Sequence, residues 1–253
     1  GTGDTPRNPF QNGDSPHPEN PECKYSSTFN GTSSAAPTVA GSVAMILEAN
    51  NNLTWRDMKH ILASTSSVTD PLRSYDIDGI NQYSWVTNFA GYSHHNWYGF
   101  GVVDIDAAIS MAENYNFPLG AFGNSGQEYS TGGEYVMGDG AQVSLTLSFN
   151  TSLFIEYIRF GFELNHDAPE TIGMELISPS GTVITILQPY HAGVTNPYND
   201  GTFGDPTYRW VTTGVAGFYG EESLGNWILR ITDYEVDGLS ATFNRWRMQI
   251  YGH

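Results

Sequence analysis

The stretch that decides the fold spans residues 30–50 and reads NGTSSAAPTVAGSVAMILEAN. It predicts a helix, because its larger apolar residues recur at helical spacing. Alanine and glycine fill much of the remaining helix surface, so we expect close packing on several sides and a central position. Proline is tolerated in a first helical turn, so Pro37 places the helix start within about three residues of Ser33. The spaced residues are Val39, Val43, Ile46 and Leu47.

Two more amphipathic helices are predicted before residue 118. One starts at Thr54, a good N-cap, with Asp57 three residues on in the place of the usual capping-box Glu. The other begins after Asp104 and ends near Tyr115, before Pro118. The first part of the chain therefore has a helical period.

The period changes to two residues from about residue 122 onward. One run alternates apolar Val143, Leu145 and Leu147 with polar residues, and others begin at Trp227 and Trp246. Turn sequences separate these runs, and many short strands with turns between them favour a sandwich or jelly roll. We therefore predict two domains, residues 1–118 and an all-β domain at 119–253.

The candidate chemistry lies at Ser33, between a glycine-containing loop and the start of the first helix. The free backbone N–H groups of a helix N-terminus can stabilise the anion formed in acyl transfer, and the N–H of Ser33 itself is one such donor. Taken alone, Ser33 could equally be an ordinary serine N-cap, because nothing local supplies a base.

The neighbouring residues resemble a known family. Gly31-Thr32-Ser33-x-Ala35-x-Pro37 resembles the serine signature of subtilisin-like proteases, and residues 47–57 and 98–104 resemble the kexin/furin branch. Residues 174–182 and 225–229 resemble the P domain (homo B domain) that follows the protease in that branch. The resemblance implies a partial α/β subtilisin-like catalytic portion followed by a β-sandwich, and a serine endopeptidase with Ser33 as the nucleophile.

In this family the catalytic Asp and His and the oxyanion Asn precede the serine along the chain, so the resemblance places all three before residue 1. His17 lies in a proline-rich loop without the His-Gly-Thr context of the family. His60 is expected on the polar side of the second helix. It and the pair His94-His95 are interpreted as structural or surface residues, although a His-His pair can also bind metal. We expect Ser33 to be inert without a preceding portion of the protease.

The lone cysteine, Cys23, and the acidic loops bear on the expected partner and metal of the chain. The resemblance implies that Cys23 pairs with a cysteine of the N-terminal portion, although its spacing to Ser33 is slightly longer than in the family. It also implies Ca²⁺, mostly at sites upstream of this chain. Within the chain, Asp76-Ile77-Asp78-Gly79 spaces oxygens like a calcium loop, but an ordinary turn is favoured. Solvated turns are likewise expected at Asp200, Asp205, Asp233 and Asp237.

The formal net charge of −17 argues against nucleic acid and anionic membranes as partners, because both attract Lys and Arg. No apolar run approaches the length of a membrane span. The start Gly1-Thr2-Gly3 has no leader and is read as that of a mature or cut product. We expect a secreted, extracellular or periplasmic protein that acts on polypeptides.

Two other functions stay open. The chain could be a non-catalytic binding or folding scaffold with a vestigial serine site, although the retained Gly31-Thr32-Ser33-x-Ala35-x-Pro37 context disfavours this. It could also be a chaperone-like fragment released by autolysis in the proline-rich loop at residues 1–22.

Overall fold

The computed structural model describes residues 11–12, 15–16, 31–72, 75–77, 80–126, 128–129, 134–190 and 207–253. These residues fall into two compact units. Unit 1 comprises Gly1–Met58 and Ile105–Tyr115, and unit 2 comprises Lys59–Asp104 and Asn116–His253. The boundary predicted between residues 118 and 119 from the sequence stays a prediction.

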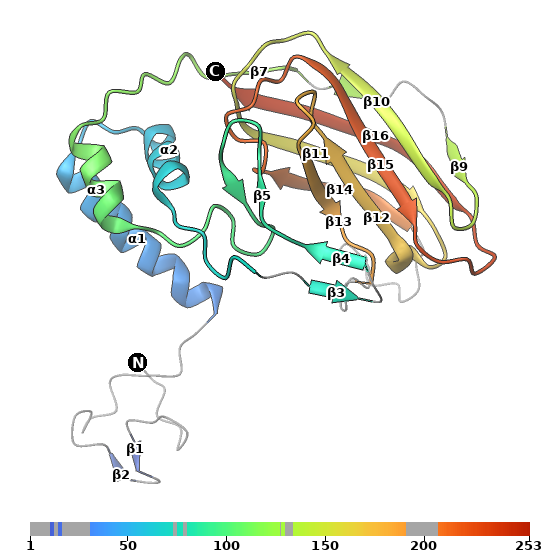
Figure 1. Cartoon of the computed structure of the whole chain (residues 1–253), viewed down its shortest axis with the longest axis horizontal. Coiled ribbons are helices and arrows are strands. Elements are labelled where there is room, and N and C mark those ends of the chain that lie inside the picture. Colours follow the sequence, from blue (N-terminus) through green and yellow to red (C-terminus); the bar gives the residue numbers. More distant parts are fainter. Residues whose placement is uncertain are drawn as a thin grey trace. The chain divides into compact units, whose positions relative to one another are not determined.

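Unit 1 contains two packed helices, α1 and α3, and a short strand pair (Figure 1). The side-chain amide of Asn50, just after α1, donates to the carbonyl of Ala112 near the end of α3 at 2.9 Å. The predicted helices are present with starts close to those expected. Their bounds are α1 Thr32–Ala49, α2 Trp55–Thr65 and α3 Ile105–Glu113, and the strand pair is β1 Gln11–Asn12 with β2 Ser15–Pro16.

The start of α2 shows why a capping sequence fixes a helix end. The carboxylate of Asp57 accepts from the backbone N–H of Thr54 at 2.8 Å and from its hydroxyl at 2.6 Å. The Thr54 hydroxyl oxygen in turn accepts from the N–H of Asp57 at 3.3 Å. Two first-turn N–H groups are satisfied in this way, so the predicted capping box is confirmed with Asp in place of Glu.

The largest part of unit 2 is a β-sandwich of two antiparallel sheets (Figure 1). One sheet has the strand order β10-β15-β12-β13, and the other has the order β14-β11-β16-β7, with β8 and β9 also pairing with β16. The bounds are β7 Gly123–Asn124, β8 Glu128–Tyr129, β9 Tyr135–Met137, β10 Gln142–Phe149, β11 Ile155–Asn165, β12 Ile172–Ile177, β13 Val183–Leu187, β14 Thr207–Val215, β15 Gly225–Asp233 and β16 Ala241–Gly252, with a 3-10 turn at Pro169–Thr171.

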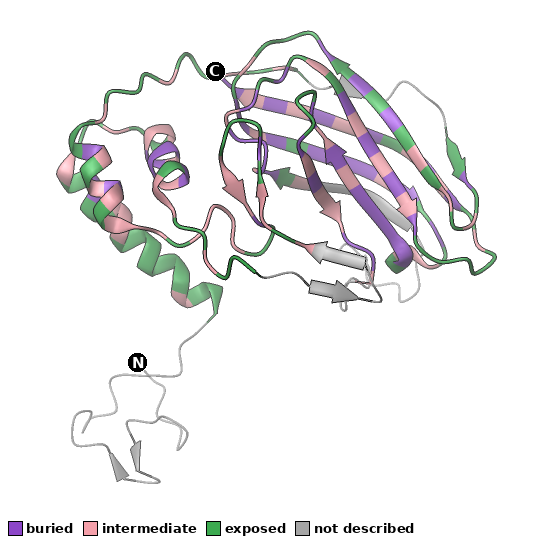
Figure 2. Cartoon of the chain, viewed as in Figure 1, coloured by how far each residue is buried: buried purple, intermediate pink, exposed green. Residues whose placement is uncertain are grey.

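The sandwich core follows from the alternation in the sequence. Along β10 the side chains of Leu145, Leu147 and Phe149 are buried while their polar neighbours are exposed. Trp227 of β15 and Trp246 of β16 are fully buried, and buried residues alternate with less buried ones along both strands (Figure 2). Because successive strand residues point to opposite faces, a two-residue period buries one face of each sheet. The predicted sandwich is confirmed.

Residues 66–104 add two short hairpins to unit 2. These are β3 Tyr75–Ile77 with β4 Ile80–Tyr83, and β5 Val86–Thr87 with β6 Ser93–His94. Nearby, Ser67 and Val102 exchange backbone hydrogen bonds, 2.9 Å each way. A side chain at Gly101 (φ 120°) would place Cβ 2.2 Å from the Ser67 carbonyl oxygen, so this close pairing requires glycine.

Candidate functional site around Ser33

Ser33 is the second residue of α1 and its side chain is exposed. The helix begins after Gly31, whose φ of 78° lies in the left-handed region that favours glycine. The carbonyl of Gly31 accepts from the N–H groups of Ser34 and Ala35, at 3.0 and 3.2 Å. The glycine therefore turns the chain sharply and presents Ser33 at the first turn.

The position of Ser33 bears on its two interpretations, an ordinary helix N-cap and a nucleophile. The N-cap is Gly31, and no side chain caps this end of the helix, so the interpretation of Ser33 as an ordinary N-cap is wrong. An N–H in the first turn has no carbonyl four residues earlier within the helix, and it lies at the positive end of the helix dipole. An exposed hydroxyl beside such donors is the arrangement that an acyl-transfer nucleophile needs.

Pro37 lies deeper in α1 than the sequence indicated. It is inside the helix rather than in its first turn, because the helix already starts at Thr32. Proline has no N–H, so it cannot donate to the carbonyl of Ser33. The Ser33 carbonyl therefore does not receive the backbone hydrogen bond that residue 37 would donate in a regular helix.

The surface of α1 corrects the expectation of a central, closely packed helix. Ile46 is its only buried residue, while Val39 and Leu47 are each 37% exposed and Met45 is 50% exposed. Within unit 1 the described residues provide α3 as a packing neighbour, and that covers one side (Figure 2). The small and apolar faces of α1 are therefore left open by the described part of unit 1.

The downstream histidines are engaged in unit 2. His60 is buried rather than on a polar face: its Nδ1 lies 3.1 Å from the Tyr219 hydroxyl, and its ring stacks on Phe117 with centroids 4.4 Å apart. His95 is buried, and its Nδ1 accepts from the N–H of Trp97 at 3.0 Å. Burial, and next the neighbouring His95, lower the pKa of His94 to about 4. These contacts describe structural histidines.

Sequence reasoning missed a polar network that fixes the β5–β6 hairpin. The buried amide of Asn88 donates to the carbonyls of Gly217 and Tyr219 at 3.0 and 2.8 Å and accepts from the N–H of Tyr92 at 2.9 Å. The buried carboxylate of Glu221 accepts from the Thr182 hydroxyl and, at 2.9 Å, from the N–H of Phe89. Partners more than a hundred residues apart leave no local signal, so a single sequence could not reveal this network.

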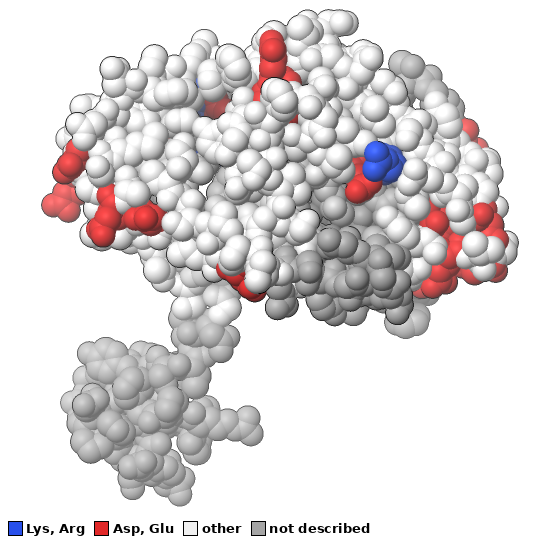
Figure 3. Space-filling model, in the orientation of Figure 1, with Lys and Arg blue, Asp and Glu red and all other residues white. Residues whose placement is uncertain are grey.

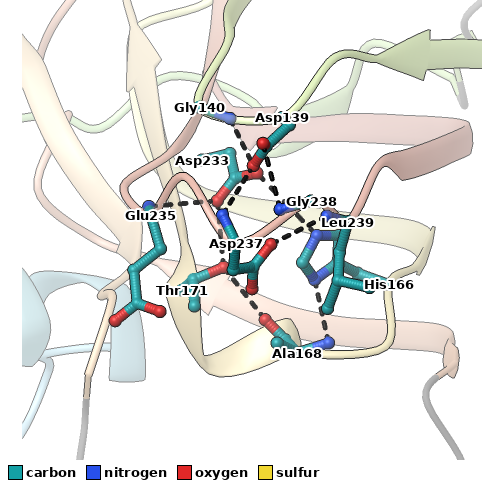
Figure 4. A network of polar contacts seen from close by, with 10 residues as sticks. All are labelled: Asp139, Gly140, His166, Ala168, Thr171, Asp233, Glu235, Asp237, Gly238 and Leu239. Carbon is teal, nitrogen blue, oxygen red and sulfur yellow. Dashed lines mark hydrogen bonds and ion pairs between the residues drawn. The ribbon is translucent and has the colours of Figure 1, made fainter.

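The expectation of solvated turns holds for Asp237, which is exposed in a bend, but is wrong for Asp233, which ends β15 and is only 3% exposed. The buried Asp233 accepts from the Thr171 hydroxyl at 3.0 Å and from the N–H of Gly140 at 3.2 Å, and its carboxylate lies 3.8 Å from Nε2 of His166 (Figure 4). Asp237 accepts from the N–H of Leu239 at 2.9 Å. Among the described residues no three His, Cys, Asp or Glu side chains gather as a metal site, the His94-His95 pair included.

Several predicted residues fall outside the described part of the chain. These are His17, Cys23, Asp78 with Gly79, Asp200 and Asp205. The pairing of Cys23 and the calcium-like spacing therefore stay predictions. Acidic side chains predominate on the face drawn in Figure 3, in keeping with the net charge of −17. None of the described helices is both long and apolar enough to span a membrane.

Two protein-family models match separate segments of the chain. The model of the subtilase family (Peptidase S8) matches residues 9–101, which include Ser33. The model of the proprotein convertase P-domain matches residues 155–250. The chain combines a subtilase segment with a P-domain. The resemblance inferred from the motifs is thus confirmed, and the subtilase segment is of a serine-protease family.

Curated relatives agree across both halves. The Aeromonas extracellular serine protease of Aeromonas sobria is 29% identical over 83% of this chain, and mouse (Mus musculus) furin is 27% identical over 90%. The chain spans only 36% of the first protein and 27% of the second. It therefore corresponds to a minor part of each relative.

Solved structures confirm the predicted fold, a partial subtilisin-like portion followed by a β-sandwich. The crystal structure of the serine protease of Aeromonas sobria matches with a TM-score of 0.72 and 25% identity over 89% of this chain and 44% of that one. The same protease in complex with its chaperone ORF2 matches with a TM-score of 0.76 and 24% identity, covering 91% and 45%.

Proposed function

We propose that this chain is the nucleophile-bearing and P-domain part of a secreted serine endopeptidase of the furin/kexin type. One observation carries the proposal: Ser33 is exposed in the first turn of α1, two residues after a glycine with positive φ, within the region that the subtilase model matches. Ser33 would attack the peptide carbonyl and form an acyl-enzyme, while its N–H would help to bind the oxyanion.

The remaining catalytic groups are proposed to come from a portion preceding this chain. The family resemblance assigns a histidine base, an orienting aspartate and an oxyanion asparagine to that portion. The chain spans about a third of the Aeromonas protease, so more than half of such an enzyme lies outside it. The exposed apolar faces of α1 support a covering partner of this kind, because a helix rich in small residues otherwise leaves apolar surface in water. A disulfide through Cys23 would join the two portions.

Labelling with a fluorophosphonate tests this proposal. The full-length protein should be labelled at Ser33, the 253-residue chain alone should not be, and Ser33→Ala should abolish labelling. Ser34→Ala is the matched control, since Ser34 is the next residue of the same helix turn. A folded full-length protein that resists labelling would instead favour the scaffold function with a vestigial serine.

Calcium is proposed as a cofactor of the preceding portion. Chelation by EGTA should then lower the melting temperature of the full-length protein and leave that of the 253-residue chain unchanged. A chain that loses stability on its own in EGTA would place a calcium site within residues 1–253 and contradict this assignment.

A further inference from the structure

Unit 2 contains a pocket that the peptidase chemistry does not use. Its volume is about 650 Å³, within the range of small-molecule sites. Side chains from α2, the β5–β6 hairpin, residues 117–120, the start of β11, the turn before β15 and the end of β16 line it. Six of the lining side chains carry aromatic rings, and we call the site the ring pocket. These are His60, Tyr92, Phe117, Phe154, Tyr219 and His253.

The rings are held in place by one another before any ligand binds. His60 stacks on Phe117, with an interplanar angle of 13°, and Tyr92 meets Tyr219 edge to face with centroids 5.0 Å apart. The ring of Phe154 lies 5.8 Å from that of His253. Phe117 and Phe154 stay 49% and 55% exposed, so part of the ring surface is open to a ligand. A preorganised site loses little side-chain entropy on binding.

Two polar side chains of the pocket lining, His253 and Ser152, are paired with carboxylates. Nδ1 of His253 lies 3.0 Å from Oε1 of Glu156, which is only 2% exposed. A carboxylate accepts, so this nitrogen carries the hydrogen, and a neutral His253 has an acceptor at Nε2. The Ser152 hydroxyl donates to Glu222 at 2.6 Å, which leaves the serine oxygen as an acceptor. In its neutral form His253, like Ser152, therefore offers a lone pair to a ligand.

The charges nearby also favour a cationic ligand. The ammonium of Lys59 donates to the Glu156 carbonyl at 2.8 Å and balances the Glu156 carboxylate. It lies 5.0 Å from the ring centroid of Tyr157, which does not line the pocket, and 5.8 Å from that of Tyr219, so an ammonium group already lies against one ring of the pocket. Glu222 then adds a further carboxylate beside Ser152, and no ion pair among the described residues engages it, on a chain of net charge −17. Ring faces are electron-rich and attract cations as well.

We propose that the ring pocket binds an organic cation with an apolar body, of the quaternary-ammonium class. The apolar body replaces water against the rings, and the positive charge meets ring faces, acceptor atoms and the field of Glu222. None of the lining residues is assigned to the peptidase chemistry proposed at Ser33, and the test of this site does not depend on proteolysis.

Choline is the probe, and its neutral isostere 3,3-dimethyl-1-butanol is the comparison. Both are titrated into the 253-residue chain while NMR follows the ring protons of His60 and His253, at a pH where both rings are neutral. Choline should shift both sets of resonances and bind roughly fivefold or more tightly than the isostere, the size expected for a partly desolvated cation–π site. Equal affinities, or no shift with choline, would overturn the proposal.

Two variants and one control test whether choline binds in the ring pocket. Phe154→Ala should weaken choline binding by about fivefold, again on the scale of a lost cation–π ring. Phe122→Ala is its matched control: Phe122 is 43% exposed, stacks on Tyr251 and does not line the pocket. Glu222→Gln, at an exposed position, should weaken binding of choline but not of the isostere. If Phe122→Ala and Phe154→Ala act alike, or Glu222→Gln changes neither ligand, the proposed site is wrong.

Discussion

The helix α1 and the strand β16 are both rich in apolar residues, yet they differ in what covers them. In β16 the side chains of Trp246, Met248 and Ile250 are fully buried. In α1 only Ile46 is buried. The partners of β16 come from strands of the same unit, whereas the described residues of unit 1 cover a single side of α1. An apolar pattern therefore predicts which residues can be buried, but not that the described residues of the same unit bury them.

The largest effect is expected in the sandwich core, at Trp227. Its side chain is fully buried, packs edge to face on Phe218 with centroids 5.0 Å apart, and donates to the carbonyl of Ser223 at 2.9 Å. Trp227→Ala removes these contacts and leaves a cavity, so it should lower the free energy of unfolding by about 3–5 kcal/mol. Urea denaturation followed by circular dichroism measures this loss.

Trp55→Ala is the matched control, because Trp55 opens α2 and is 62% exposed. It should cost less than about 1 kcal/mol, since much of its surface is already in water. If the two tryptophan variants lose the same stability, the contrast between the sandwich core and the helical region does not hold.

A smaller loss is expected at the hairpin network. Asn88→Ala leaves two buried carbonyls and one N–H without their partner, and each unsatisfied buried group is costly. The free energy of unfolding should fall by about 2–3 kcal/mol. Asn114→Ala, which removes one exposed hydrogen bond to Ser110, is the control and should change stability by less than about 0.5 kcal/mol. Equal losses would show that the Asn88 bonds add nothing.

Local patterns and long-range contacts differ in how far the sequence could predict them. The capping box at Thr54 and the alternation ending in Trp227, Leu229 and Ile231 are local patterns, and the structure confirms both. The burial of His60 depends on Tyr219, 159 residues away, and a helix-face argument therefore put it wrongly on a polar side. Asn88 reaches 131 residues to the Tyr219 carbonyl. Ser33 is predicted as a nucleophile from its neighbours, because that sequence signature is local, and its role stays a prediction.

The pH dependence of stability tests His94 of the β5–β6 hairpin, whose side chain is partly buried. Burial holds the pKa of His94 at about 4, below the usual 6.5, so the unfolded chain binds a proton there more readily than the folded one. Stability from this group is present above pH 6.5 and is lost as the pH falls towards 4. The wild-type chain should lose about 1–2 kcal/mol more than His94→Gln over this interval, measured by urea denaturation. Parallel losses in both proteins would mean that another group accounts for the acid sensitivity.

The smallest change in the stability of the isolated chain is expected for a substitution on α1. This prediction tests the contrast between α1 and β16 most directly. Met45 is 50% exposed, so Met45→Lys should change the free energy of unfolding of the 253-residue chain by less than about 0.5 kcal/mol. In the full-length protein the same lysine should block fluorophosphonate labelling of Ser33, because an ammonium group is costly to bury where apolar surface is proposed to pack.

Glu48→Lys is the control for charge on the same helix, since Glu48 is exposed and replaces no apolar surface. It should leave labelling within about twofold of the wild type. If Met45→Lys is equally harmless in the full-length protein, the open face of α1 is a solvated surface like any other. The difference between α1 and β16 would then reflect the composition of the helix, and not a missing partner.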